Sequence, residues 1–262
     1  MYTYSLEHKR YLHELKKERI IITIIRVFII LILLITWELL SRFNIINSFL
    51  FSSPSKVFNT CIKLFNNGEL IRHIRVTLYE VIISFLLSTI IGVFIASIMW
   101  FNKRFSKVID PYITIFNSLP KVALGPLFII WVGASIKSII VMSLTISLFT
   151  TIINIYQGFI SVNNNYIILA KSLGANKFQT FRKIIFPSNL SNIIATLKIN
   201  ISLSLIGVIM GELLVSKMGL GYLIMYGSQV FNLDLVISSI FILGIISYLM
   251  YFIIDKIEKR LW

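Results

Sequence analysis

The chain has 262 residues, of which 57% are hydrophobic and only 14% are charged, and its mean hydropathy is +0.87. A soluble domain of this length does not need so much apolar surface for its core, so the composition excludes an ordinary soluble globular protein. The net charge of +14 could indicate nucleic-acid binding, but the basic residues gather in short segments between long apolar runs. This pattern is typical of a membrane protein and argues against nucleic acid as a partner.

Long uncharged stretches indicate membrane-spanning helices. Residues 138–170 and 235–254 contain no Asp, Glu, Lys or Arg. A helix of about 20 such residues crosses the roughly 30 Å of hydrocarbon in a lipid bilayer. We therefore predict an all-α integral membrane protein with about six transmembrane helices, in which residues 1–19 are a cytoplasmic N-terminal segment and residues 20–262 a single transmembrane domain. The predicted spans are residues 20–40, 76–100, 109–132, 136–156, 190–215 and 235–254.

The basic residues predict the orientation of these spans. The first apolar run is longer than the hydrophobic region of a signal peptide, so we expect it to be retained as a helix. Six spans place both termini on one side of the membrane, and the segments on that side hold fifteen Lys and Arg, against seven in the opposite segments. Since positive charge marks the cytoplasmic side, we predict cytoplasmic termini. The expected cytoplasmic segments are residues 1–19, 102–107, 159–189 and 255–262.

Three prolines fall in the third predicted span. Pro111, Pro120 and Pro126 each remove a backbone donor and disfavour a straight helix. Irregular backbone at membrane depth survives only where protein or a water-filled cavity covers it, which indicates the interior of the bundle or a pathway. We expect this span to be kinked or broken, with Asn117 and Ser118 as candidate pathway residues beside the break. A kink that serves packing alone is an equal alternative for any one proline.

The outer connection, residues 41–75, is longer than packing requires. Ser53 and Pro54 precede apolar residues at helical spacing. A capping serine followed by proline is typical of a helix start. We expect an amphipathic helix that lies on the outer face of the membrane.

The cytoplasmic connection, residues 159–189, is also long, and long ordered loops usually carry function. Asn163 to Asn165 offer capping side chains, Tyr166 to Leu173 is a compact helical pattern, and Gly174 follows where a helix would end. A second helical segment is expected from Lys177 into Pro187. Such a helix could dock on another protein, or it could lie on anionic headgroups.

Ionisable side chains inside the spans are costly in lipid and tend to face the bundle interior. Glu38 and Glu80 are near the outer ends of their spans, where partial solvation is the simpler explanation. Glu212 is the strongest functional candidate, for substrate contact or for a structural role between subunits. The candidate pathway and gate residues are Asn117, Ser118, Pro120, Asn200, Ser204, Glu212, Gly219 and Gly221, the last two in a re-entrant or outer-surface hairpin expected at residues 217–234.

Catalytic and metal-binding motifs are missing from the sequence. Cys61 is the single cysteine and the three histidines are scattered, so they suggest neither a disulfide nor a metal cluster. No G-x-x-x-x-G-K-[ST] phosphate-binding loop occurs, and no spacing suggests a nucleophile with its base and acid. We therefore predict no catalytic residue, no cofactor, no metal and no ATP hydrolysis by this chain.

The cytoplasmic connection also carries a family pattern. The run Ile168-Leu169-Ala170-Lys171-Ser172-Leu173-Gly174-Ala175, separated by nine residues from Ile184-Ile185-Phe186-Pro187, resembles the EAA loop of ABC importer permeases in both spacings. Ile168 occupies the position of the family's glutamate and Leu169 that of its first alanine, so the helix is more apolar than the pattern. Further runs that resemble the nitrate/sulfonate/taurine branch of binding-protein-dependent permeases are Ser53–Val57, Gly68–Leu70, Asp110–Pro111, Pro120–Leu127, Trp131–Gly133, Gly211–Glu212 and Gly219–Leu223.

This resemblance implies a type I (MetI-like) importer permease fold in a bacterial inner membrane. In that family two permease subunits form the pathway, ABC ATPase subunits dock on the EAA loops, and an extracytoplasmic solute-binding protein delivers the substrate. Tyr166–Ala175 would be the coupling helix, with Ala170 and Gly174 allowing close approach of the ATPase. The residues that the resemblance assigns to coupling are Tyr166, Ile168, Leu169, Ala170, Lys171, Gly174, Ala175, Ile184 and Pro187.

The function that we expect is a homodimeric permease subunit of an ATP-driven importer, with a small polar anion such as nitrate, a sulfonate or taurine as its substrate. Related permeases serve vitamin precursors such as the thiamine pyrimidine or riboflavin, so this substrate class stays open. A non-transporting membrane scaffold or sensor is another alternative, although a scaffold has no reason to keep the fixed spacing of the loop. An ion-coupled carrier would need a chain of intramembrane carboxylates, and the spans contain too few.

Overall fold

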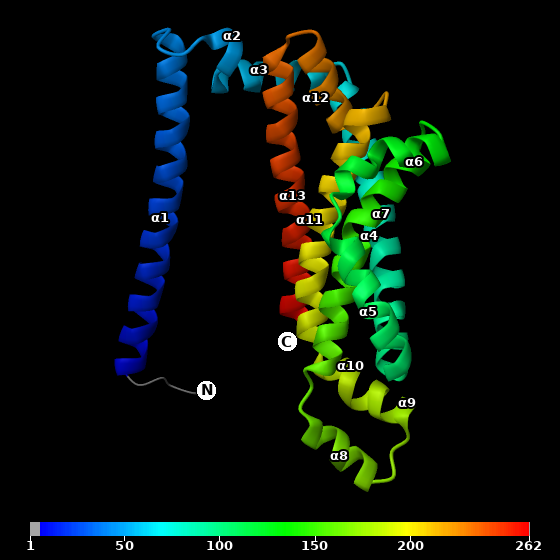
Figure 1. The fold of residues 1–262 in the computed structure, drawn as a ribbon. Helices are drawn as coiled ribbons and strands as arrows, with labels where there is room; N and C mark the ends of the chain where they lie inside the picture. Colours follow the sequence, from blue (N-terminus) through cyan, green and yellow to red (C-terminus); the bar gives the residue numbers. More distant parts are fainter. Residues whose placement is uncertain (1–5, 262) are drawn as a thin grey trace.

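A computed structural model describes residues 6–261, and within this range the chain is helical with no β-strand (Figure 1). The predicted all-α fold class is confirmed. Five helices are long and apolar enough to cross a membrane, and a helix pair bent by 86° is the sixth candidate. Residues 1–5 of the predicted N-terminal segment lie outside the described residues. The long helices are α1 (Leu6–Arg42), α4 (Glu69–Phe101), α7 (Ile136–Ile160), α11 (Leu190–Val215) and α13 (Leu233–Leu261).

The turn after α4 is tighter than the sequence suggests. We expected a cytoplasmic segment at residues 102–107, but α5 (Lys103–Ser118) begins directly after the capping residue Asn102. The Asn102 side chain accepts hydrogen bonds from the backbone N–H groups of Arg104 and Phe105, both at 3.1 Å. Because this cap satisfies free donors at the helix start, the basic residues of this segment form the first turns of α5.

The third span is broken at Pro120. Leu119 has extended backbone angles (φ −63°, ψ 144°), as the steric demand of a following proline requires. α5 continues through Pro111 without a break, and Pro126 lies in the first turn of a helix, where its missing N–H leaves no bond unmade. The predicted break is therefore confirmed at one proline of the three. After it come the 3₁₀ turn η1 (Lys121–Leu124) and α6 (Gly125–Val132).

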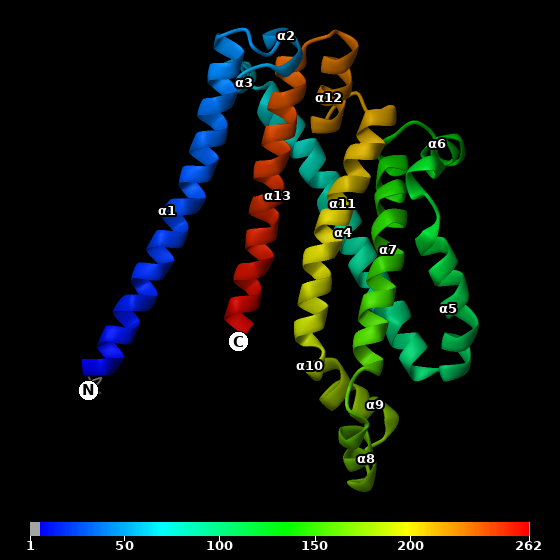
Figure 2. The same cartoon turned by 60° about the vertical axis from the view of Figure 1, so that its left-hand side comes forward.

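Helices α4, α7 and α11 pack against one another as the core of the bundle (Figure 2). Small residues let their backbones approach closely, as is common between helices in membranes. A Cβ atom added to Gly211 of α11 would lie 2.9 Å from the Ile139 side chain of α7, and one added to Gly92 of α4 would lie 2.6 Å from Thr151. α7 and α11 also approach closely at Gly207, where an added Cβ would collide with the backbone of Ser143 at its Cα.

The short helices gather at two opposite ends of the molecule (Figure 1). We call them the α12 end and the α8 end. α1 starts and α13 finishes on the side of the α8 end, as six crossings require. The α12 end carries α2 (Ser48–Phe51), α3 (Pro54–Asn66) and α12 (Leu220–Gln229), and the α8 end carries α8 (Asn164–Ser172), α9 (Lys177–Thr180) and α10 (Phe186–Ser188).

The amphipathic helix predicted after Ser53 is α3. The Ser53 side chain caps it by accepting a hydrogen bond from the Lys56 N–H at 3.3 Å, and Pro54 is its first residue. α3 links the far end of α1 to the bundle, because Glu38 of α1 accepts hydrogen bonds from the N–H and hydroxyl groups of Ser55 at 3.1 and 3.0 Å.

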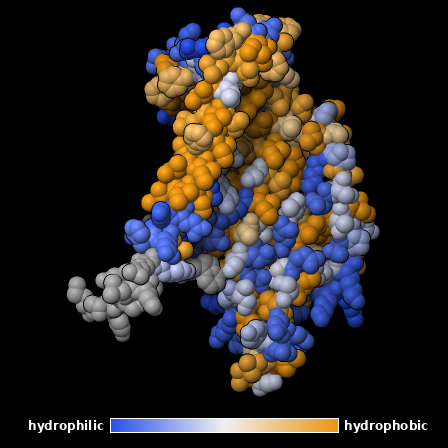
Figure 3. All heavy atoms as spheres, turned by 90° about the vertical axis from the view of Figure 1, so that its left-hand side faces the viewer, coloured by the Kyte–Doolittle hydropathy of each residue, from blue (hydrophilic) through white to orange (hydrophobic). Residues whose placement is uncertain are grey.

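Below this link, α1 stands apart from α13 (Figures 1 and 2). An apolar groove of about 870 Å³ runs between them and is lined by α1, α3, α4 and α13. Figure 3 shows that the apolar surface continues over this side of the molecule. The apolar part of α1 has no buried residue, so this helix depends on lipid or on another protein for its packing.

The packing of α7 on α11 can be tested with two glycine substitutions. Gly207→Ala should lower the free energy of unfolding by about 1–3 kcal/mol, because its methyl group meets the Ser143 backbone and forces the helices apart. Gly244→Ala in α13 is the matched control, since its Cβ meets no atom within 4 Å and alanine is the better helix former. Thermal unfolding of both variants in detergent checks this. Equal unfolding temperatures for Gly207→Ala and Gly244→Ala would contradict close packing at Gly207.

Candidate functional site

The connection between α7 and α11 folds into a protrusion, which we call the α8–α10 loop (residues 161–189; Figure 1). The Asn163 side chain caps α8 by accepting a hydrogen bond from the Asn165 N–H at 2.9 Å. Gly174 has a left-handed backbone (φ +76°), which favours glycine and ends the helical stretch. The helix, the cap and the glycine terminus that the sequence predicts are all confirmed.

The second helical segment of the loop is confirmed as well. It comprises α9, a wide π-turn at Phe181–Ile185 and α10, which has Pro187 in its first turn. Proline cannot donate to the preceding helical turn, and a π-turn is a common response to such a gap. Ile185 is fully buried in a cluster with Phe159 of α7, and this contact attaches the loop to the core.

α8 and its C-terminal cap Leu173 carry large exposed apolar side chains, and those at positions 166, 169 and 173 share one helical face, which we call the apolar face of α8. Tyr166, Ile168, Leu169 and Leu173 expose 57%, 54%, 57% and 79% of their surface. Apolar atoms lie at the tip of the protrusion, next to basic and polar residues (Figure 3). A cluster of large exposed apolar side chains with a polar rim is typical of a protein-docking surface. Because Ile168 and Leu169 replace more polar or smaller residues of the EAA pattern, the departure from that pattern enlarges this surface.

Ala170 does not face outward as the sequence interpretation assumed. It is only 6% exposed, so its methyl group packs inside the α8–α10 loop. The statement that Ala170 allows close approach of a partner is therefore wrong, and its small size serves the loop's own packing. Gly174 is exposed, with no atom within 4 Å of an added Cβ. Of the other predicted coupling residues, Lys171 and Pro187 are exposed, and Ala175 and Ile184 are half-buried.

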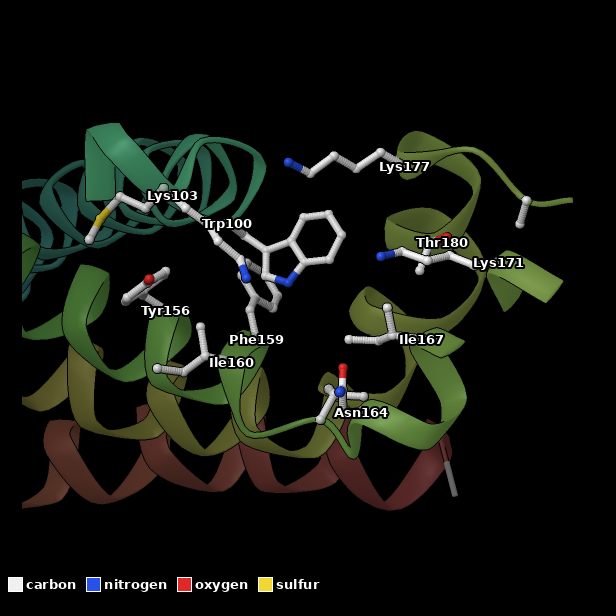
Figure 4. A pocket seen from close by; sticks show the side chains of 13 residues that line it. Trp100, Lys103, Tyr156, Phe159, Ile160, Asn164, Ile167, Lys171, Lys177 and Thr180 are labelled. Atoms are coloured by element: carbon white, nitrogen blue, oxygen red, sulfur yellow. The ribbon is translucent and has the colours of Figure 1, made fainter. Parts of the chain in front are cut away.

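A cavity of about 560 Å³ separates the α8–α10 loop from the ends of α4, α5 and α7 (Figure 4). Lys103, Lys171 and Lys177 line it together with Trp100. The Lys177 ammonium donates to the Phe101 carbonyl and lies 5.8 Å from the centre of the Trp100 ring. This cation–π contact ties α9 to the end of α4. The loop is therefore held to the core by apolar packing on one side and by a lysine on the other.

At the opposite end of the molecule, side chains from two long helices hold the start of α12. We call His73, Thr77 and Glu212 the α12 anchor. The Gly219 N–H donates to His73 Nδ1 at 2.9 Å, the Leu220 N–H donates to Thr77 Oγ1 at 2.9 Å, and the Gly221 N–H donates to Glu212 Oε2 at 2.5 Å. The Thr77 hydroxyl in turn donates to Glu212 Oε1 at 2.7 Å. Three successive backbone donors at a helix start are thereby satisfied, and the carboxylate lies at the positive end of the helix dipole.

Gly219 and Gly221 have no room for a side chain beside this anchor. A Cβ on Gly219 would collide with the Glu212 carboxyl group, and Gly219 has φ +106°. A Cβ on Gly221 would lie 2.7 Å from the Cβ of Glu212. Glu212 is 1% exposed, so its carboxylate serves the contact between α11 and α12 and is closed to solvent. As a candidate gate residue, Glu212 would therefore act by holding α12 in place and not by touching the solute.

Asn200 and Ser204 lie between helices, where they bond other protein groups. Asn200 is 1% exposed, accepts from the Ser88 hydroxyl at 3.0 Å and donates to the Thr89 hydroxyl at 2.8 Å, which joins α11 to α4. Ser204 is 0% exposed, and its carbonyl accepts from the Ser143 hydroxyl of α7 at 2.9 Å. In this structure the two candidate pathway residues are thus enclosed between helices. Their polar groups join the three core helices.

Glu80 is also buried, and the expectation of partial solvation for it is wrong. It is 0% exposed and lies beside Glu212. Within residues 6–261, neither of its carboxyl oxygens has a hydrogen-bond partner, and the same holds for the Ser84 hydroxyl one turn further along α4. No group of three or more His, Cys, Asp or Glu side chains able to hold a metal ion occurs in that range.

The break in the third span brings together residues that the sequence singled out only in part. Asn117 is half-buried in the last turn of α5, while Ser118 and Pro120 are exposed. The side-chain oxygen of Asn117, Oδ1, accepts a hydrogen bond from the Thr150 hydroxyl of α7 at 3.0 Å and another from the Lys121 ammonium at 2.9 Å. Sequence reasoning missed Lys121, although a lysine directly after the proline of a broken span was a visible signal.

Comparison with known proteins agrees with this architecture. Residues 88–262 match the family model described as "Binding-protein-dependent transport system inner membrane component". Over 231 residues the chain is 31% identical to the formylaminopyrimidine transport permease protein ThiX of Halalkalibacterium halodurans, with 88% of this chain and 92% of the relative covered. It is 26% identical over 230 residues to the putative aliphatic sulfonates transport permease protein SsuC of Bacillus subtilis, with 88% and 83% covered.

Among solved structures, the fold resembles that of the MetNI methionine ABC transporter in an inward-facing conformation. The TM-score is 0.67 and the sequence identity 20%, over 74% of this chain and 97% of that one. At this identity the likeness supports a common fold and carries no information on the solute.

The α12 anchor predicts a local effect of Thr77→Val. The substitution leaves the buried Leu220 N–H and one Glu212 oxygen unpaired, at a cost of about 1–3 kcal/mol each. Amide hydrogen exchange in residues 219–224 should then accelerate by about tenfold or more. Thr36→Val is the control, because the Thr36 hydroxyl is exposed and bonds only to carbonyls of its own helix. Unchanged exchange at α12 in Thr77→Val would show that the anchor does not hold this helix.

Proposed function

The chain belongs to the family of binding-protein-dependent transport system inner membrane components, and we propose that the apolar face of α8 is the surface through which an ATPase subunit drives it. The chain is the permease subunit of an ABC importer and is not itself an enzyme. Permeases of this family work with ABC ATPase subunits and a binding protein, and ATP is hydrolysed on the separate ATPase subunit.

The observation that carries this proposal is the exposure of Ile168, Leu169 and Leu173 on a helix that ends outside the bundle. In water, so many apolar side chains on one short helix are unfavourable unless a partner covers them. The loop that carries them is fixed to α7 through the cluster of Phe159 and Ile185. A force applied to α8 therefore acts on the core helices.

We further propose that the α8 end faces the cytoplasm, where ATP is available. The termini of the described chain lie at this end (Figure 1). The positive-inside rule supports the same orientation, since the segments at the α8 end hold fifteen Lys and Arg against seven at the α12 end. In this orientation α3 and α12 are on the outer face, where the binding protein delivers the solute.

A homodimer is the assembly that we propose. The groove of about 870 Å³ between α1 and α13 is lined by apolar side chains, among them Leu34, Phe58 and Ile245. We assign this place to a second copy of the chain, because two permease subunits form the pathway in the family that the α8–α10 loop resembles. The chain would then contribute one half of the pathway.

The proposed solute is a small polar molecule with an anionic group of the sulfonate type. The name of the SsuC relative supports this class. A second candidate is a vitamin precursor, because the ThiX relative is named for formylaminopyrimidine transport. Uptake of both types of solute in membranes that contain the whole transporter would separate these candidates.

The docking surface can be tested by placing a charge on it. Leu173→Glu should leave the permease folded, since this side chain is 79% exposed, but should weaken association with the ATPase by about tenfold or more, because an unpaired charge becomes buried in the interface. Leu173→Met is the matched control and should bind and transport as the unmodified protein does. Ala170→Arg is unsuitable because Ala170 is buried in the loop.

The readouts are ATPase co-purification and solute uptake, together with the amount of permease in the membrane. Should Leu173→Glu keep the ATPase bound and transport unaltered, α8 is not the docking surface. Loss of the permease itself from the membrane would instead show that Leu173 serves the fold.

A further inference from the structure

Three of the 25 basic residues, Arg26, Lys121 and Lys198, fall well inside the predicted spans, and Lys137, counted above with the opposite segments, is the second residue of its span. Lys198 of α11 is neutralised by two acidic side chains of α13, at 2.8 and 2.6 Å. Arg26 is exposed on α1, the helix that stands apart from the bundle, and Lys137 is exposed in the first turn of α7. Lys121 differs from these three, because it lies between helices and has no acidic partner within salt-bridge distance among the side chains that the structure describes.

The surroundings of Lys121 are neutral. Its ammonium donates to Asn117 Oδ1 at 2.9 Å and to the Ile146 carbonyl at 3.2 Å, and it lies 5.9 Å from the centre of the Phe149 ring. Asn117 is on α5, and Ile146 and Phe149 are on α7. The ammonium therefore lies between α7 and the break that Pro120 makes in the third span.

This charge is deep in the membrane. Ile146 is the eleventh residue of α7, which runs from Ile136 to Ile160, so at 1.5 Å per residue it lies about 15 Å from the start of the helix. That is about half of the roughly 30 Å hydrocarbon thickness. A lysine at this depth is costly, and such residues usually mark a solute or ion pathway.

The polar groups around Lys121 leave donors free. A lysine ammonium has three N–H bonds, of which two are used. Asn117 Oδ1 must be the atom that faces Lys121, because an ammonium only donates. The Thr150 hydroxyl also donates to this oxygen. The Asn117 Nδ2 group consequently points elsewhere, and within residues 6–261 its two N–H bonds have no acceptor.

Both side chains are partly open. Lys121 and Asn117 are half-buried, while Ser118 and Pro120 beside them are exposed. A site with one uncompensated positive charge and several free N–H donors fits an anionic oxygen-bearing group, such as a sulfonate or a carboxylate. A role confined to packing would not require a charge, because a neutral side chain could bond the same two oxygens without the cost of desolvation.

We propose that Lys121 and Asn117 form an anion-binding site at the break of the third span, which contacts the anionic group of the solute during its passage. This inference rests on the proposed function. It adds to that function the place where the solute is contacted and the chemical group that is recognised. Lys121 supplies the charge, and the Asn117 amide, fixed by Thr150, supplies directed donors. An uncharged solute can accept the same hydrogen bonds but lacks the attraction between opposite charges.

The first experiment uses charged thiol reagents, so it needs neither the natural solute nor ATP. Ser118→Cys is made in a Cys61→Ala background, which removes the single native cysteine. The probes are a sulfonate-bearing methanethiosulfonate and its trimethylammonium analogue, applied to membranes that contain the full chain. With Lys121 present, the thiol introduced by Ser118→Cys should react faster with the anionic reagent than with the cationic one. Lys121→Gln should lower the ratio of these two rates by about tenfold. Lys121→Arg should keep most of it.

Two controls keep this result interpretable. In Ser172→Cys on α8, the reagent preference should be the same with Lys121 and with Lys121→Gln, because this thiol lies at the α8 end. Butanesulfonate should slow the anionic reagent at the Ser118→Cys thiol in the protein that keeps Lys121, whereas butyramide should not, and this comparison does not depend on the folding of a Lys121 variant. The proposal is overturned if the reagent preference is the same with Lys121 and with Lys121→Gln. It is also overturned if butanesulfonate and butyramide slow the anionic reagent equally.

Solute uptake separates this inference from the proposed function. In membranes with the complete transporter, Lys121→Gln should reduce ATP-dependent uptake of the sulfonate taurine by about tenfold and Lys121→Arg by much less. Taurine uptake equal to that of the unmodified protein in Lys121→Gln would overturn the anion site and leave the importer function intact. Uptake that does not depend on ATP would contradict the proposed function, whatever the thiol reagents report.

Discussion

The close contact of α4, α7 and α11 is the constraint on which the rest of the structure depends. In a bilayer, apolar side chains gain little by leaving lipid for protein, so helices associate through close backbone approach and interhelical hydrogen bonds. Gly92, Gly207 and Gly211 provide the approach. Asn200 and Ser143 provide the hydrogen bonds. Every feature with a proposed function is attached to at least one of these three helices.

The α8–α10 loop is placed where it can act on this core. It connects α7 directly to α11, so its two ends are fixed on the most closely packed helix pair of the molecule. α11 has 26 residues and is about 39 Å long, and its far end carries Glu212, which holds α12. A displacement of α8 by a bound ATPase would thus reach the opposite end of the molecule through a single rigid element, without a chain of intermediate loops.

The polar groups of the spans divide by what they contact. Lys198 is paired with acidic residues, and the Asn200 side chain bonds Ser88 and Thr89 of α4, so both are accounted for by the fold. Lys121 keeps an unneutralised charge beside a helix break. A charge that no acidic side chain neutralises is the feature expected where an anionic solute passes, since the solute supplies the missing counter-charge.

Local patterns in the sequence were enough to predict the features that depend on neighbouring residues. The apolar runs predicted the long helices, the three prolines of the third span predicted that it is kinked or broken, and Asn163 and Gly174 predicted the two ends of α8. Contacts between distant segments had no such signal: Thr77 meets Glu212 across 135 residues, and His73 meets Gly219 across 146. The direction in which a side chain faces could not be predicted either. Ala170 was expected on a docking surface, Asn200 along a pathway and Glu80 at a solvated helix end, but packing buries all three.

The most direct test of the account is to ask what touches the apolar face of α8 in the assembled transporter. A photo-activatable phenylalanine analogue at Leu169, which is 57% exposed, should form a covalent product with the ATPase subunit when membranes are irradiated. The same analogue at Phe65 of α3, which is 58% exposed at the opposite end, should form none. A product with the ATPase from Phe65 and none from Leu169 would contradict both the docking surface and the orientation.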